Sequence, residues 1–343
     1  MRTDCGWDTR DLDRCRICSE AAAQRRGGIV SGDAGGRYLG PPIAASRQWR
    51  VDSPVARKDD EVTRAETTTG SELPADGDVV AERLAPEVVS LKLNRPHHLN
   101  ALTSPMLERL YDVLGHLGRD PTCRVIIVTG VGRGFCAGDD LQDYRPPEWV
   151  PTDVGPMQSH MYQQKYVAEL VPRMRSLPQP VIAAVNGPAA GAGYALALGA
   201  DLRIAGESAI FVDSFVKIGA SGAEMGLSWL LQRVVGATRA AELVLTGRRV
   251  DAAEAEKIGL VLRTVPDDQL LDAAMALAGE IVSNTPMGTW MGKATLWSNL
   301  EISSLEAAID LEARTQILTL ATDDAKEQLQ AFRERRPARY TNR

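Results

Sequence analysis

The sequence predicts an α/β fold. Apolar, β-branched runs typical of buried strands alternate with helical segments up to about Phe211, and beyond Leu227 the pattern indicates helices separated by turns. The chain has 343 residues, of which 44% are hydrophobic, so it can form a substantial core.

The first predicted elements are a hairpin, a helix and a buried strand. Residues 79–84 and 88–93 form the hairpin, and Pro86 and Glu87 make its turn. Ser104 caps the helix, because a polar side chain is followed by Pro105 at the first helical position. Residues 125–129, VIIVT, form the buried strand.

The middle and the end of the chain continue this alternation. One helix is predicted over about 157–175, strained or broken near Pro172. A strand at 181–185 leads through a tight turn into an apolar helix at about 194–198, and short strands follow at 202–205 and 209–212. The last predicted helix runs from Leu305 to about Arg335 and carries mixed charges.

The first 75 residues differ from the rest. Segment 1–75 is rich in Arg, Asp, Gly, Ser and Thr, so it is predicted to be a disordered extension. It holds three of the five cysteines, Cys5, Cys15 and Cys18. A zinc site is disfavoured because a fourth ligand is not nearby, and free cysteines are the better interpretation.

Composition narrows the functional classes. The formal net charge is −6 without a dominant basic run, which argues against nucleic acid as a partner. No uninterrupted apolar stretch reaches the ~20 residues that span a bilayer, and the N-terminus lacks the apolar core of a signal peptide. We therefore expect a soluble cytoplasmic protein that does not bind membranes.

Two loops with few side chains follow predicted strands. Residues 130–140, GVGRGFCAGDD, follow the strand at 125–129, and residues 189–193, AAGAG, follow the strand at 181–185. Such loops let a ligand approach the backbone closely, and the free amides at a helix start suit a negative oxygen. Two of them can each offer one N–H to the same oxyanion. Neither has the spacing of a phosphate-binding or dinucleotide-binding loop.

These loops resemble the enoyl-CoA hydratase/isomerase family, the crotonase superfamily. The matching stretches include FCAGDDL at 135–141, AAVNGPAAGAGYALALGADLRIA at 183–205 and ELVLTGRRVDAAEAEKIGLV at 242–261. The resemblance covers about 78–336. It implies a spiral of ββα units forming an acyl-CoA-binding core at 76–265. It also implies a helical region at 266–343 that mediates homotrimers or homohexamers.

The resemblance also implies the site. The substrate is an acyl-CoA thioester, and its carbonyl oxygen lies between the backbone N–H groups of Asp139 and Ala192. Other positions implied to contact the substrate are Ala101, Ala137, Gly138, Asp140, Leu141 and Gly191. Coenzyme A is part of the substrate, and neither a separate cofactor nor a metal is implied.

The chain departs from the family pattern at two positions. The hydratases use two glutamates to activate water, and Ala195 and Phe215 occupy those positions here. Neither side chain can transfer a proton. Glu224 lies in SGAEMG at 221–226, where small and apolar neighbours favour a raised pKa and a role as base. Some isomerases of the family carry an acidic residue near this position.

The sequence therefore predicts double-bond isomerisation through an enolate, with Glu224 as the base. The alternatives are hydration at a site that lacks the usual two glutamates, and a non-catalytic protein that binds acyl-CoA. Decarboxylation and hydrolysis use the same oxyanion hole and stay open. Asp139 and His160 are rival proton-transfer residues, whereas Asp140 is expected to brace its loop.

Overall fold

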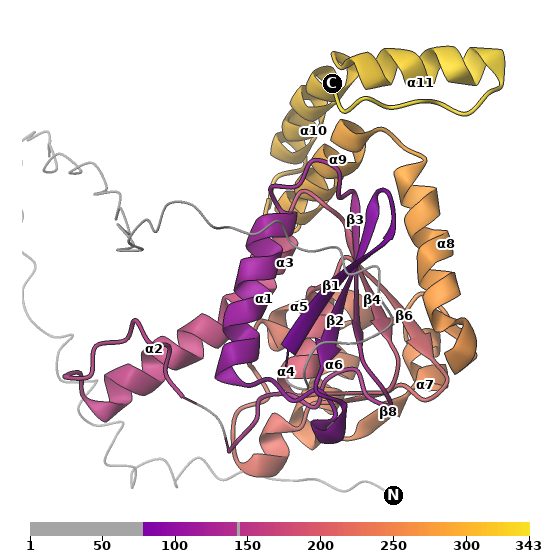
Figure 1. Cartoon of the computed structure of the whole chain (residues 1–343). Helices are drawn as coiled ribbons and strands as arrows, with labels where there is room; N and C mark the ends of the chain where they lie inside the picture. The colour runs from indigo at the N-terminus through magenta and orange to yellow at the C-terminus, as the bar shows by residue number, and fades with distance from the viewer. Residues whose placement is uncertain (1–77, 143–144) are drawn as a thin grey trace, which may run out of the picture. The chain divides into compact units, whose positions relative to one another are not determined.

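The computed structural model describes residues 78–142 and 145–343, so the predictions for segment 1–75 and its cysteines lie outside the described residues. A six-stranded sheet forms the centre of the described part (Figure 1). Its order is β1-β2-β3-β4-β6-β9, and only the β1–β2 pair is antiparallel. The strands are β1 Asp78–Ala85, β2 Val88–Asn94, β3 Val125–Gly130, β4 Val181–Val185, β6 Leu202–Gly206 and β9 Thr264–Val265.

A second sheet of three short strands was not anticipated. Its order is β5-β7-β8, and its strands are β5 Pro188–Ala190, β7 Ile210–Val212 and β8 Arg249–Asp251. Residues 189–193, predicted to be a loop with few side chains after β4, therefore begin in a strand. Its hydrogen-bonding partner, β7, lies far along the chain, which is why local sequence shows no sign of the pairing.

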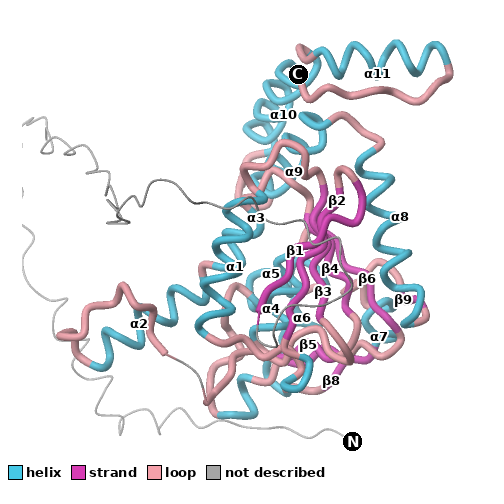
Figure 2. Tube along the Cα trace, viewed as in Figure 1, coloured by secondary structure: helices cyan, strands magenta, loops and turns pink. Residues whose placement is uncertain are grey.

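Helices cover both faces of the large sheet, as Figure 2 shows. Alternate residues of β3 and β4, such as Ile127 and Ile182, pack against α8, Leu270–Val282. The residues between them, such as Ile126 and Val181, belong to the larger core on the other face. That core includes α1 Ser104–Leu117, α3 Leu170–Arg175, α4 Ala192–Gly199 and α5 Leu227–Val235. The two-sided burial explains why these strands are continuous apolar runs, and the predicted α/β fold is confirmed.

Two predicted helix starts need correction, and one predicted break is confirmed. Thr103 caps α1, one residue before Ser104, because its hydroxyl accepts a hydrogen bond from the Met106 amide. The helix predicted over 157–175 is broken near Pro172 as expected, into α2 Pro156–Ala168 and α3, which meet at Glu169. Pro172 explains the break, since its ring clashes with the carbonyl four residues earlier. The apolar helix predicted at 194–198 begins earlier, at Ala192.

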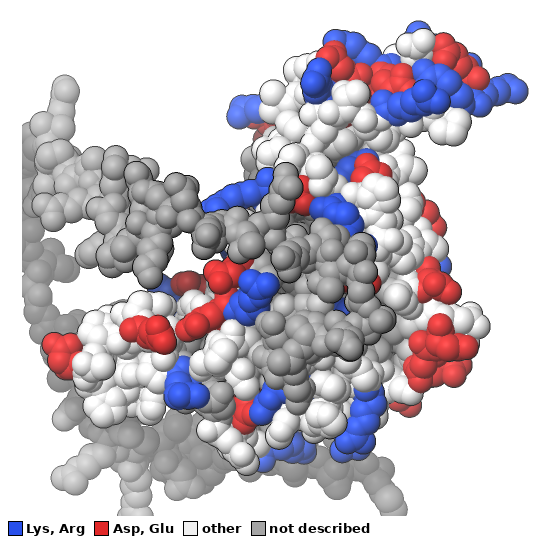
Figure 3. Space-filling model, in the orientation of Figure 1, with Lys and Arg blue, Asp and Glu red and all other residues white. Residues whose placement is uncertain are grey.

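Residues 266–343 are helical, as predicted, but the strands β8 and β9 interrupt the helices that were predicted directly after Leu227. The helices after α5 are α6 Ala237–Thr246, α7 Ala252–Lys257, α8, α9 Pro286–Asn299, α10 Leu305–Leu320 and α11 Asp323–Glu334. The single helix predicted from Leu305 to Arg335 was wrong, because Thr322 caps a new helix by accepting a hydrogen bond from the Ala325 amide. Acidic and basic side chains alternate along α11 (Figure 3).

A buried ion pair attaches α9 to the sheet. Lys293 Nζ lies 2.7 Å from Asp201 Oδ2 and also donates to the Gln179 carbonyl. The indole N–H of Trp297 donates to the other Asp201 oxygen at 2.6 Å. Asp201 also accepts a bond from the amide of Val181, the first residue of β4. One carboxylate therefore ties α9 to the start of a central strand.

Within residues 78–142 and 145–343, every helix is too short or too polar to cross a lipid bilayer.

Candidate active site

Three loops meet beyond the ends of β2, β3 and β4. The loop after β3 is paired on one side with residues near Leu102 and on the other with β5. The Leu102 amide donates to the Gly138 carbonyl and the Leu102 carbonyl accepts from the Asp140 amide, both at 2.8 Å. On the other side, the Ala190 amide donates to the Cys136 carbonyl at 2.9 Å. These bonds hold the two bare loops side by side.

The amides of Asp139 and Ala192 lie close together. A Cβ built on Gly138 would lie 3.4 Å from the Ala192 nitrogen and 2.9 Å from the Ala190 carbonyl oxygen. Gly138 has a φ of +100°, so both its backbone angle and its contacts require glycine. Leu102 is hydrogen-bonded to the Gly138 carbonyl and to the Asp140 amide, which are the backbone groups before and after Asp139. The N–H of Asp139 itself therefore points away from Leu102. Neither amide has a protein acceptor among the described residues.

The backbone conformation of Gly191 orients the amide of Ala192. This glycine has a φ of +52° and a ψ of −120°, a conformation available to glycine, and its own N–H donates to the Val212 carbonyl. Ala192 is the first residue of α4, so its N–H has no partner within the helix. The Phe215 ring packs beside Gly191, and Ala195 is fully buried in α4. Ala195 and Phe215, which the sequence analysis placed at the glutamate positions of the hydratases, are therefore both packed in apolar surroundings.

Glu224 lies on the loop before α5. The side-chain amide of Gln164, on α2, donates a hydrogen bond to Glu224 Oε1. The loop turns back at Met225 and Gly226, whose φ angles are +48° and +81°. Burial raises the pKa of Glu224, while hydrogen bonds from the Met225 amide and from Gln164 partly offset this effect. The geometry gives a half-buried carboxylate held by a neutral amide, which suits a base near neutral pH.

The side chain of Asp139 is coupled to Glu224. Burial and the nearby charge of Glu224 raise the pKa of Asp139 to about 7. Asp139 Oδ1 is shielded from solvent and has no hydrogen-bond partner among the described residues. The two carboxyl groups come from loops far apart in the sequence. Asp139 and Glu224 were each candidates from the sequence, but no sequence pattern indicated that the two carboxyl groups would interact.

Asp140 has the bracing contacts that the sequence analysis expected. Its carboxylate lies 2.6 Å from Arg95 Nη1 and accepts a hydrogen bond from the Gln142 amide. Arg95 also donates to the carbonyl of Ala101 in its own loop, so the contact with Asp140 joins the loop after β2 to the loop after β3. The Ala137 amide is bonded to the Leu99 carbonyl. Leu141 is 70% exposed at the rim.

Four further side chains, of which only His160 is a candidate from the sequence analysis, are exposed. His160 is exposed on α2, and Lys217 is also exposed. Trp149 and Tyr162 are more than two-fifths exposed and contact each other edge to face. Across the described ranges, His, Cys, Asp and Glu side chains form no group of three or more that could hold a metal.

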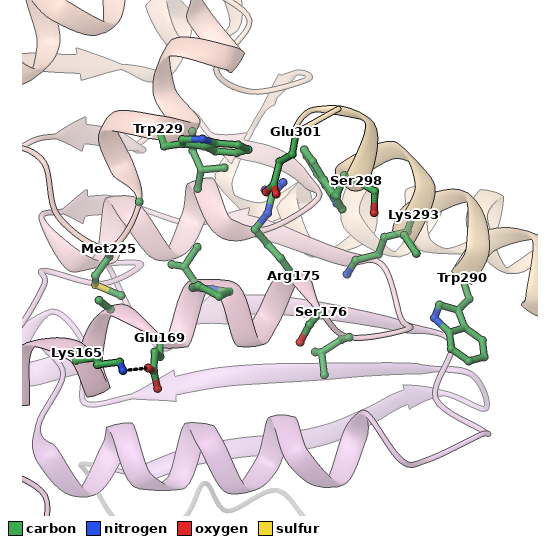
Figure 4. A pocket seen from close by; sticks show the side chains of 18 residues that line it. Lys165, Glu169, Arg175, Ser176, Met225, Trp229, Trp290, Lys293, Ser298 and Glu301 are labelled. Atoms are coloured by element: carbon green, nitrogen blue, oxygen red, sulfur yellow. Dashed lines mark ion pairs between the residues drawn. The ribbon is translucent and has the colours of Figure 1, made fainter. Parts of the chain in front are cut away.

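A cavity of about 730 Å³ lies beside Met225, the residue that follows Glu224. It lies between α2, α3, α5 and α9 (Figure 4). Its lining also includes Lys165, which follows Gln164. Trp229, Trp290 and Trp297 contribute most of its aromatic surface. The guanidinium carbon of Arg175 lies 3.4 Å from the Trp297 ring centroid, over the ring, and Figure 4 shows Arg175 reaching toward Glu301.

The described core matches a known family in sequence. The model of the enoyl-CoA hydratase/isomerase family matches residues 84–343. A probable enoyl-CoA hydratase of Mycobacterium tuberculosis is 40% identical over 265 residues, which cover 77% of this chain and 93% of the relative. The 1,2-epoxyphenylacetyl-CoA isomerase of Escherichia coli is 38% identical over 257 residues, which cover 75% of this chain and 95% of the relative.

Solved structures match as well. A probable enoyl-CoA hydratase/isomerase from Mycobacterium abscessus has a TM-score of 0.72 and 35% identity, and the match covers 77% of this chain and 99% of the other. A monofunctional enoyl-CoA isomerase from Mycobacterium smegmatis has a TM-score of 0.57 and 40% identity, with 67% and 97% covered. The predicted crotonase-like fold is confirmed by these similarities.

Proposed function

Because the chain belongs to the enoyl-CoA hydratase/isomerase family and is an enzyme of that family, we propose that it moves the double bond of an enoyl-CoA thioester. Glu224 is the base in this proposal. The amides of Asp139 and Ala192 form the oxyanion hole, and the loops that carry Ala101, Ala137 and Gly138 hold the thioester. The half-buried carboxylate of Glu224, fixed by Gln164, is the observation that carries the proposal.

The reaction begins with removal of a proton from the carbon next to the thioester carbonyl. The electrons of the broken C–H bond move onto the carbonyl oxygen and form an enolate. Two backbone donors aimed at this oxygen stabilise it, and loss of one such donor typically costs about 2.7–4 kcal/mol of transition-state stabilisation. Reprotonation at the γ-carbon then completes the double-bond shift. These steps need no cofactor apart from the coenzyme A of the substrate.

Isomerisation is favoured over hydration because Ala195 and Phe215 stand at the two positions where the hydratases of the family carry their water-activating glutamates. Ala195 is fully buried and the Phe215 ring packs beside Gly191, so neither side chain can activate water. Isomerases occur among the similar proteins from Escherichia coli and Mycobacterium smegmatis, alongside proteins called probable hydratases. Hydration by Glu224 alone is the second candidate, supported by those hydratase relatives.

Deuterium exchange from solvent tests the proposal. A panel of 3-enoyl- and 2-enoyl-CoA thioesters is incubated in D₂O with the wild type, with Glu224→Gln and with Glu280→Gln. Glu280 is the control for loss of a glutamate as such, because it is exposed on α8 and does not line the cavity beside Met225. We expect α-carbon exchange and a moved double bond in the wild type and the control, and a loss of about 10²-fold or more in Glu224→Gln.

Three results would contradict the proposal. Full turnover by Glu224→Gln removes Glu224 as the base. A 3-hydroxyacyl-CoA product in the wild type establishes hydration instead. Tight thioester binding without α-carbon exchange in the wild type indicates a binding protein.

The cavity beside Met225 is the proposed place for the acyl chain. It is mostly apolar, and it starts one residue from Glu224 in the loop and one residue from Gln164 in α2. Trp229 forms part of its wall, so Trp229→Ala is expected to shift the preference toward longer or bulkier acyl chains. Specificity constants for a series of chain lengths measure this shift.

The C-terminal helices are the proposed subunit interface of a homotrimer or homohexamer in the cytoplasm. Large apolar side chains of α9, α10 and α11 are exposed in the single chain, and Phe332 is 77% exposed. An apolar surface of this kind marks an interaction site. The others are Trp290, Leu296, Leu305, Ile309, Ile317, Leu318, Leu320 and Leu329, and Leu300 directly follows α9.

A further inference from the structure

We propose that Asp139 is a second catalytic carboxyl, which delivers a proton to the γ-carbon after Glu224 has taken one from the α-carbon. This inference rests on the proposed isomerisation. It assigns Asp139 two separate tasks: its backbone N–H binds the enolate oxygen, and its side chain acts as the acid. Glu224 and Asp139 then form a pair that shares one proton.

The backbone of Asp139 is held on both sides. The carbonyl before it and the amide after it are both bonded to Leu102. The residue therefore has little freedom to turn, and its carboxyl stays next to the amide that faces the substrate oxygen. A side chain attached at that point lies close to the carbons that neighbour the thioester carbonyl.

The neighbouring aspartate provides a direct contrast. Asp140 is of the same residue type in the same loop, but Arg95 and the Gln142 amide bind its carboxylate. Asp139 is not in any ion pair of the described residues, and its Oδ1 is buried without a partner. A buried polar atom without a partner is costly and calls for an explanation. A role toward substrate explains why the chain keeps it.

The proton belongs on Asp139 rather than on Glu224. Two carboxyl groups that repel each other in a partly dry site do not both ionise easily. Glu224 receives hydrogen bonds from Gln164 and from the Met225 amide, and these stabilise its anion. Burial and the charge of Glu224 raise the pKa of Asp139 to about 7. Below about pH 7 Asp139 is thus mostly neutral, beside a Glu224 whose anion is favoured by these two hydrogen bonds.

The proposed reaction consists of three proton transfers. Glu224 takes the α-proton, and the C–H electrons form the enolate. The enolate collapses as its γ-carbon takes the Asp139 proton, so the double bond moves to the α,β position. Glu224 is then neutral and Asp139 ionised. Transfer of a proton from Glu224 to Asp139 restores the starting state, and the substrate gains and loses one proton overall.

Two rates measured on the Asp139→Asn variant test this inference. One is α-carbon exchange with D₂O, which needs only Glu224, and the other is isomerisation, which also needs the acid. Asparagine keeps the backbone N–H and the side-chain shape. We expect exchange to stay within about threefold of wild type and isomerisation to fall by about 10²-fold or more. A drop in both rates together, or in neither, overturns the inference.

The pH profile adds a readout that a structural role would not move. Isomerisation needs neutral Asp139, so wild-type kcat/KM falls above about pH 7, and Asp139→Asn lacks this basic limb. Asp213→Asn is the matched control. Asp213 also has a shielded oxygen without a partner in the described residues, and burial raises its pKa to about 6, but it does not act on Asp139. An unchanged basic limb in Asp139→Asn contradicts the inference.

A label experiment tests the wild type directly and does not depend on a variant that folds. A 3-enoyl-CoA with two deuterons on the α-carbon is converted in a single turnover in H₂O by excess enzyme. Delivery by Asp139 puts protium on the γ-carbon. Deuterium on the γ-carbon shows that Glu224 carries the same proton across, which overturns the inference and leaves the proposed function intact. Absence of α-carbon exchange in the wild type instead refutes the proposed function itself.

Discussion

Replacement of Asp139 by asparagine is expected to stabilise the protein at neutral and higher pH. Burial and Glu224 raise the pKa of this carboxyl from 3.8 to about 7 in the folded state. Between these two values the folded state binds a proton that the unfolded state has released. Stability contributed by this group therefore falls as the pH rises through this window, and asparagine does not titrate.

The magnitude follows from the shift of about three units. At about 1.4 kcal/mol for each unit, the wild type loses at most about 4 kcal/mol relative to the variant between pH 4 and pH 7. Urea unfolding of both proteins at several pH values from 4 to 8.5 measures this difference. We expect equal free energies of unfolding near pH 4, a growing advantage of the variant up to pH 7, and a constant difference above it.

Asp153→Asn is the control for loss of a carboxylate as such. Asp153 is exposed on the loop before α2, so its replacement should change the free energy of unfolding by less than about 0.5 kcal/mol at every pH. A pH-independent difference between wild type and Asp139→Asn refutes the reasoning. A variant less stable than wild type at pH 8 also refutes it.

Further predictions concern the supports of the site. Asp201→Asn leaves the buried Lys293 charge without its partner, so urea unfolding should show a loss of about 3–5 kcal/mol; addition of Lys293→Met should restore part of it, and an additive double variant would contradict the pairing. Gly191→Ala forces a Cβ to within 2.9 Å of the Ser214 hydroxyl at a φ of +52°. It should lower the stability by about 1–3 kcal/mol and reduce kcat/KM, whereas wild-type kinetics would argue against a strict role of this turn. Phe332→Asp should reduce the molar mass measured by light scattering, and an unchanged mass would exclude Phe332 from the interface.

The sequence alone determined the fold class and the two loops of the candidate site. Strands such as 125–129 and 181–185 are apolar throughout because helices cover both faces of the sheet. Burial on both faces therefore produces an unbroken apolar run, which can be recognised in the sequence. The two loops with few side chains after these strands were recognisable from composition. Their backbones pack closely on each other, as at Gly193 and the Cys136 carbonyl, and this leaves no room for side chains. Glu224 stood out because its neighbours are small and apolar.

Only the tertiary structure decided how these parts act together. The coupling of Asp139 to Glu224 and the hydrogen bond from Gln164 join three segments that are distant in the sequence. Electrostatic and hydrogen-bonding energies depend on separation in space, and no local periodicity or composition encodes that separation. The pairing of β5 with β7 and the attachment of α9 through Asp201 also join segments that are distant in the sequence, so neither could be predicted from local sequence. Local sequence therefore specified which residues were unusual, and the fold decided which of them meet.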